Sequence, residues 1–202
     1  MLFIELFVPQ DGLGADRCRR VAQGLLVRMT GDGDEAMDRA TAEIFASRFH
    51  VTVHRPESWV VGDRPAGDPA DGPRPYLVRV HVPGPWRKDT AEHIIGAFTR
   101  AITEEDPDAD VQVYVLGVPE GSIGVRGEVK TSTDLVEMMN APLRDAYAEG
   151  KALLDPMCGV LVDPAKAPTL EYEGTLYGFC CQGCRTAFVA KKEKEAARAA
   201  SG

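Results

Sequence analysis

The sequence predicts an α+β protein in which a tandem β-α-β domain precedes a small cysteine-rich domain. A strand–helix–strand pattern occurs twice within the first 130 residues. Four of the five cysteines lie at or after Cys158. The formal net charge of −8 is also unevenly placed, because residues 1–150 carry −9 and residues 151–202 carry +1. The chain of 202 residues is therefore expected to contain two parts with different chemistry.

Each repeat begins with a predicted strand and continues into a predicted helix. Apolar residues alternate in 2–9 and in 76–83, and both stretches end in Val-Pro, where the missing N–H stops strand pairing. A second strand, 49–56 or 111–119, closes each repeat, so the strands within a repeat should be parallel. The helical positions expected to face the core are Cys18, Val21, Ala22, Leu25 and Met29 in the first copy and Ala91, Ile94, Ile95, Phe98 and Ile102 in the second.

The composition divides the chain further. Pro, Gly and Asp dominate residues 62–74, which predicts a solvated linker without regular structure. An extra short helix is expected within 34–48, with Met37, Ala40, Ile44 and Phe45 facing inward. The predicted organisation is a duplicated domain at 1–130 (units 1–61 and 75–128), a helical connector at 131–153, a cysteine domain at 154–192 and a helical or frayed tail at 193–202.

The first nine residues, MLFIELFVP, the duplicated plan and the closing segment VPEGS resemble the tautomerase superfamily over about residues 1–130. The resemblance implies a fused two-unit member and a trimeric assembly. It also implies a catalytic proline at the mature N-terminus, and Leu2 stands at that position. Leucine has no ionisable group, so proline-dependent tautomerisation is not expected. The first half is predicted to be a pseudoenzyme scaffold that retains a pocket.

The remaining cysteines follow the spacing Cys158-x21-Cys180-x3-Cys184, with Cys181 as an additional thiol. A segment of this size rarely buries a stable core without a metal or a disulfide. Cys158 lies in a Cys-Gly turn, and the other thiols precede a predicted helix, whose N-terminus favours thiolates. Soft thiolates select Zn(II) or Cu(I). A structural zinc clip, a redox dithiol and accidental clustering are the alternatives.

The same segment, with DPMCG at 155–159 and GTLYGFCCQGC at 174–184, resembles the YHS/TRASH family of small metal-binding domains. The resemblance implies a treble-clef or zinc-ribbon-like fold with ligands at Cys158, Cys180 and Cys184. Serine is common in that family where this chain has Cys181, so either three or four thiolates bind. The pattern FCCxGC is also similar to metal-binding segments of some copper-transporting ATPases, which favours Cu(I).

Other features limit the possible partners. The acidic balance argues against a nucleic-acid partner, and no apolar run approaches the roughly 20 residues that span a bilayer. With no basic leader, a cytoplasmic location without a membrane partner is expected. Cys18 is predicted to be a buried, inert thiol, and His50, His54, His81 and His93 are assigned to packing or subunit contacts.

The main functional prediction is a non-catalytic cytoplasmic protein that binds Zn(II) or Cu(I) through Cys158, Cys180, Cys184 and Cys181. Its role would be metal sensing, buffering or transfer to a metal-acceptor protein, such as an oxygenase or a transporter. The alternative is a tautomerase-superfamily enzyme that acts on a small keto or unsaturated acid and uses the metal domain only as a structural element.

Overall fold

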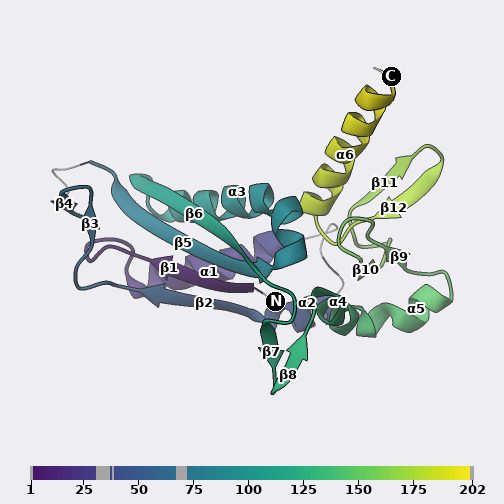
Figure 1. Cartoon of the computed structure of the whole chain (residues 1–202), viewed down its shortest axis with the longest axis horizontal. Coiled ribbons are helices and arrows are strands. Elements are labelled where there is room, and N and C mark those ends of the chain that lie inside the picture. The colour runs from purple at the N-terminus through teal and green to yellow at the C-terminus, as the bar shows by residue number, and fades with distance from the viewer. Residues whose placement is uncertain (1, 31–36, 38, 67–71, 201–202) are drawn as a thin grey trace.

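The computed structural model describes residues 2–30, 37, 39–66 and 72–200. A four-stranded sheet forms the first half, in the order β2-β1-β5-β6 (Figure 1). Its strands are β1 (Leu2–Phe7), β2 (Phe49–His54), β5 (Arg74–Pro83) and β6 (Ala109–Val118). Strand β1 is parallel to β2, β5 is parallel to β6, and β1 is antiparallel to β5. Parallel pairing within each repeat is therefore confirmed.

Two long helices cover one face of this sheet (Figure 1). They are α1 (Ala15–Thr30) and α3 (Arg87–Glu105), and a 3-10 turn, η3 (Gly84–Trp86), leads into α3. The alternating positions of the central strands are buried against the helices, as the sequence pattern predicts, because successive strand side chains point to opposite faces. These positions are Leu2, Ile4, Leu6, Tyr76, Val78, Val80 and Val82.

Three sequence predictions need correction. Val60–Val61 (β3) pairs with Arg64–Pro65 (β4), so a hairpin extends into the predicted linker at 62–74; Gly62 adopts the positive φ of 65° that its tight turn requires. Ile95 is 41% exposed, and its neighbour Ala97 is buried instead. The extra helix is α2 (Arg39–Ala46), in which Ala40 is exposed and Thr41 is buried. The predicted features at 31–36, 38 and 67–71 lie outside the described residues.

An ion pair in the second repeat is linked to the first repeat through the hydroxyl of Tyr76. The Asp106 carboxylate at the end of α3 accepts hydrogen bonds from both the guanidinium of Arg74 and the hydroxyl of Tyr76. The Tyr76 hydroxyl in turn accepts the backbone N–H of Leu13 at 3.1 Å. Hydrogen bonding from Arg74 lowers the pKa of Asp106 to about 2. This network joins β5 and α3 to the loop before α1.

We expect Asp106→Ala to lower the free energy of unfolding by about 3 kcal/mol, because it leaves Arg74 and Tyr76 without their buried acceptor. Since the Asp106 pKa is lowered in the folded state, its stabilisation is present above the unfolded value near 3.8 and is lost as the pH falls towards about 2. Urea unfolding at pH 7 and pH 3 measures both effects. Asp108→Ala is the control, because that carboxylate is 79% exposed; an equal loss in both variants would contradict the prediction.

The predicted connector contains two helical pieces, as the sequence indicates, and a short hairpin that the sequence analysis did not predict precedes it. The hairpin pairs β7 (Ile123–Val125) with β8 (Glu128–Lys130), and α4 (Ser132–Asn140), η4 (Ala141–Leu143) and α5 (Arg144–Ala148) follow. A capping box between Thr131 and Asp134 starts α4. Leu135 and Met139 are buried, so α4 is attached to the scaffold by its apolar side.

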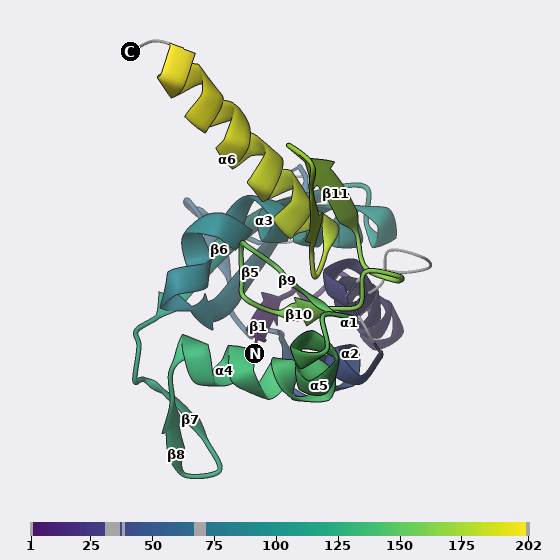
Figure 2. The same cartoon turned by 90° about the vertical axis from the view of Figure 1, so that its right-hand side faces the viewer.

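The C-terminal module consists of two small hairpins and a helix. Strand β9 (Leu153–Leu154) pairs with β10 (Leu161–Val162), and β11 (Thr169–Tyr172) pairs with β12 (Thr175–Gly178). Helix α6 (Gln182–Ala200) then projects away from the sheet (Figure 2). The turn between β9 and β10, the β11–β12 hairpin and α6 follow one another as in a treble-clef unit. Together with the sheet and helices of the first half, this module confirms the predicted α+β class. No helix in the described part of the chain is long and apolar enough to cross a bilayer.

Candidate metal centre

Local turns bring distant cysteines together in the C-terminal module. Cys158 lies in the turn between β9 and β10, where Gly159 has a φ of 76° and donates its N–H to the Asp155 carbonyl at 2.9 Å. Cys180 follows β12, and Cys184 lies in the first turn of α6. The turn and the start of the helix therefore present their side chains towards each other.

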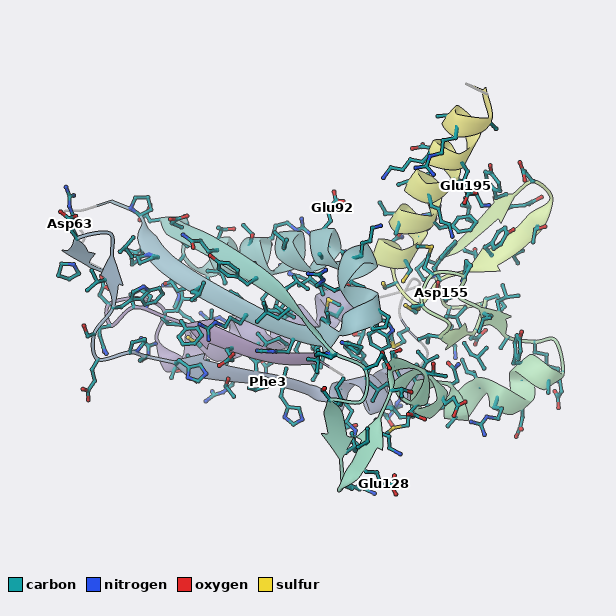
Figure 3. All side chains as sticks on the ribbon, in the orientation of Figure 1. Phe3, Asp63, Glu92, Glu128, Asp155 and Glu195 are labelled. Carbon is teal, nitrogen blue, oxygen red and sulfur yellow. The ribbon has the colours of Figure 1, made fainter. Side chains whose placement is uncertain are left out.

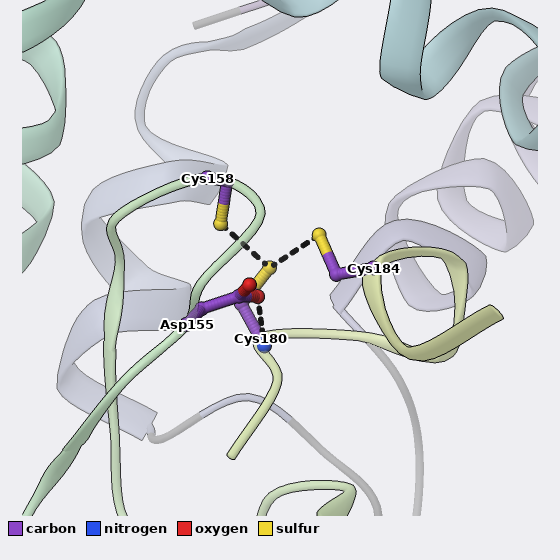
Figure 4. A group of neighbouring side chains, drawn as sticks. All are labelled: Asp155, Cys158, Cys180 and Cys184. Atoms are coloured by element: carbon purple, nitrogen blue, oxygen red, sulfur yellow. Dashed lines mark hydrogen bonds between the residues drawn. The ribbon is translucent and has the colours of Figure 1, made fainter. Parts of the chain in front are cut away.

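Three sulfur atoms form the centre of this arrangement (Figure 4). The Sγ atom of Cys180 lies 3.5 Å from that of Cys158 and 3.6 Å from that of Cys184. Ligand atoms of these three cysteines and of Asp155 all lie within 4.8 Å of one another. Cys180, Cys184 and Asp155 are buried, and Cys158 is partly buried. Three thiolates and a carboxylate are a donor set that fits a four-coordinate Zn(II) or a Cu(I) ion of lower coordination number.

Asp155 is a site residue that the sequence analysis did not assign, although it begins the motif DPMCG. Its carboxylate accepts the backbone N–H of Met157 at 2.8 Å and that of Cys180 at 2.8 Å. Burial, followed by the charge of Cys158, raises its pKa to about 7. Figure 3 shows Asp155 at the junction between the end of the sheet and the module. A single buried side chain thus connects the two cysteine-bearing segments.

The fourth predicted thiol occupies a different position. The Sγ atom of Cys181 lies 3.8 Å from that of Cys180, but Cys181 does not belong to the group that the other three cysteines form with Asp155. Adjacent residues point their side chains in different directions, which explains the separation. Both Cys181 and the main cluster line the same cavity.

The thiols differ in how readily they ionise. Hydrogen bonds from Cys180 and Cys184 hold the pKa of Cys158 well below its usual value. The pKa of Cys180 is raised well above its usual value by its interaction with Cys158 and by burial. The Cys158 thiolate therefore disfavours ionisation of Cys180. A bound cation would offset this repulsion and allow both thiols to ionise.

A cavity of about 380 Å³ lies next to the cysteines. Its walls include Leu2, Val82 and Ile94 from the sheet and α3, together with the cysteines of the module. Leu2 is 3% exposed and occupies the position where the tautomerase resemblance implies a proline. The expected catalytic corner of the scaffold and the cysteine cluster thus share one cavity, which spacing along the chain did not indicate.

The fifth cysteine lies elsewhere. Cys18 is buried in α1, donates to the Leu13 carbonyl at 3.4 Å, and has a pKa raised by burial. The prediction of a buried thiol at Cys18 is confirmed, and it serves below as an internal control.

Comparisons with known proteins agree with the module. A family model described as the YHS domain matches residues 153–198. A copper-transporting P-type ATPase of Rhizobium leguminosarum bv. viciae is 50% identical over 40 residues, which are 19% of this chain and 5% of that protein. Residues 153–198 therefore match the YHS domain, as the sequence resemblance predicts. It spans only a small part of the curated relative.

Two solved structures resemble a larger share of the chain. Pt0534 inactivated by 2-oxo-3-pentynoate is similar over 65% of this chain and 98% of its own, with a TM-score of 0.48 and 13% identity. Native fused 4-OT is similar over 63% of this chain and 94% of its own, with a TM-score of 0.46 and 18% identity.

Proposed function

We propose that this protein binds a soft metal ion, Cu(I) or Zn(II), through Cys158, Cys180 and Cys184, for sensing, buffering or transfer of the metal. The observation that carries the proposal is the meeting of three sulfur atoms and the Asp155 carboxylate within 4.8 Å of one another. Structural metal sites with this ligand density stabilise small domains that lack a large core. Asp155, which accepts two backbone N–H groups, would hold the ligand turns in place or complete the coordination.

Cu(I) is the preferred ion within this proposal. Thiolates bind both ions, but Cu(I) accepts two or three sulfur ligands without requiring a tetrahedral fourth. The similarity of the segment to part of a copper-transporting ATPase supports the same choice. The cytoplasm, where thiols remain reduced, is the compartment in which such a site would operate.

The scaffold is proposed to be non-catalytic. Leu2 is buried in the cavity wall and offers no base or nucleophile. The second candidate function, an enzyme that acts on a small keto or unsaturated acid, is favoured only by the size of the cavity, about 380 Å³, which could hold such a molecule. Turnover of an enolisable acid that survives loss of the cysteines would establish it.

A homotrimer is part of the proposal. The sheet face opposite α1 and α3 presents Phe3, Tyr114 and Leu116, which are 41%, 51% and 39% exposed. Exposed apolar residues gathered on one sheet face are typical of a subunit contact. Light scattering of the full chain should give a mass near three times 21.9 kDa. A metal-acceptor protein would dock near the module, and co-purification with the metal-loaded chain tests that part.

The test of the metal site is a titration of the reduced full chain with Cu(I) and with Zn(II), each in competition with a chromogenic chelator. The double variant Cys158→Ser, Cys184→Ser should lose binding at the main cluster, because two of its three thiolates are removed. Cys18→Ser is the matched control and should bind as the unmodified chain does. The proposal fails if the unmodified chain binds neither ion, or if the double variant binds as tightly as the control.

A further inference from the structure

The cavity beside the cysteine cluster contains a second set of soft ligands. Four of the six methionines of the chain line it, namely Met29, Met37, Met139 and Met157. They come from α1, the segment before α2, α4 and the Cys158 turn, so four separate segments place thioethers around one space. Cys181 and His93 line the same cavity. Neither Cys181 nor His93 belongs to the group formed by Asp155 and the other three cysteines.

His93 is unusual among the polar groups of this cavity. Its Nε2 atom is buried and has no hydrogen-bond partner within the described residues. An unpaired buried ring nitrogen is costly, because it loses its hydrogen bonds to water without replacement. This nitrogen is therefore available to bind a metal ion.

Gly183 explains how the ring approaches the cysteines. A Cβ atom at Gly183 would lie 2.8 Å from Cγ of His93, closer than such atoms approach in proteins, and 3.0 Å from Nδ1, a tight contact. Glycine at this position therefore allows the His93 imidazole of α3 to pack against the start of α6, at the residue that separates Cys181 from Cys184 in the chain. The glycine at position 183 thus leaves the space that the His93 ring occupies.

We propose that Cys181, His93 and a cavity methionine form a second Cu(I) site, separate from the main cluster. Thiolate, imidazole and thioether are ligands that Cu(I) accepts together, whereas methionine is a poor ligand for Zn(II). The apolar walls would keep the ion from water and from oxidation. The inference goes beyond the proposed function, because it predicts two Cu(I) ions per chain but one Zn(II), and it gives Cys181 a role distinct from that of a fourth cluster ligand.

The experiment is an anaerobic titration of the reduced full chain with Cu(I) against bicinchoninate, with copper X-ray absorption of the loaded protein. The unmodified chain should bind two Cu(I), with nitrogen and sulfur in the average coordination shell. His93→Leu should weaken the second ion at least about 10-fold and remove the nitrogen contribution, while the first Cu(I) and the single Zn(II) remain. His50→Leu, which changes an exposed histidine on β2, is the matched control.

Two further variants guard against an unfolded His93→Leu. His93→Gln keeps a polar side chain of similar size, and Met→Leu at all four cavity positions conserves volume. Both should lower the affinity for the second Cu(I) and leave Zn(II) binding unchanged. One Cu(I) per chain, or two Cu(I) that bind equally tightly in the unmodified chain and in His93→Leu, would overturn the inference. Both of these results are compatible with metal binding at Cys158, Cys180 and Cys184. If the unmodified chain binds no metal at all, the proposed function itself is refuted.

Discussion

Replacing Asp155 with alanine is expected to lower the metal affinity of the module between 10- and 100-fold, and the free energy of unfolding by about 3 kcal/mol. The carboxylate is fully buried and accepts the N–H groups of Met157 and Cys180. Without it both donors are buried and unpaired, and the Cys158 turn is no longer attached to the segment that carries Cys180. The thiolates would then have to be ordered by the metal itself.

Asp155→Asn removes the negative charge of this side chain and one of its two hydrogen-bond acceptors, but keeps its size. The amide oxygen can accept one of the two N–H groups, but the amide nitrogen cannot accept the other, so the loss should be intermediate. Glu171→Ala, on the exposed side of β11, is the control and should change either quantity little. Competition titration and urea unfolding give the two readouts. Equal behaviour of Asp155→Ala and Glu171→Ala would show that the buried carboxylate has no organising role.

Removal of the metal is expected to release the module while the sheet stays folded. Residues 153–200 form only two short hairpins and a helix, and such a unit has little core of its own. Metal present at about 1,000 times its dissociation constant contributes roughly 4 kcal/mol to the folded state. Chelation should therefore raise the amide exchange of β9–β12 and the first turns of α6 by about three orders of magnitude, which is the same free energy expressed as a rate.

The amides of β1 and β5 provide the internal comparison, because these strands lie at the centre of the sheet and their hydrogen bonds do not depend on the cysteines. Hydrogen–deuterium exchange of the full chain, with and without a chelator, measures both regions in one sample. Unchanged protection in the module after complete metal removal would mean that packing alone orders it. Loss of protection throughout would mean that the two halves unfold as one unit.

The sequence predicted the sheet well because the alternation of its strands is strong and local. Leu2, Ile4 and Leu6 in β1 and Tyr76, Val78 and Val80 in β5 all reach the core. The cysteine spacing likewise indicated three of the four side chains that the fold brings together, since a turn and a helix start are recognisable features. Helix faces were less certain: Ile95 fits the apolar stripe but is exposed, because α3 presents Ala97 to the sheet instead.

Contacts between distant segments were beyond the sequence pattern. Asp155 resembles any turn residue until its two N–H partners, one of them 25 residues away, are known. His93 has no metal-ligand spacing of its own, so the sequence predicts packing or subunit contacts; only the fold brings α3 against Gly183, two residues after Cys181. The shared cavity depends on how the module is attached, which no local propensity specifies.

The wall shared between Leu2 and the cysteines has a consequence for protein engineering. Cutting the chain before β9 would not simply leave an open pocket in the scaffold. It would expose the side chains of Leu2, Phe45, Val82 and Ile94 to water, because the module now covers that side of the cavity. Separating the two halves would thus expose apolar surface on each of them. A module transferred to another protein would need apolar side chains on that protein to cover its side of the cavity.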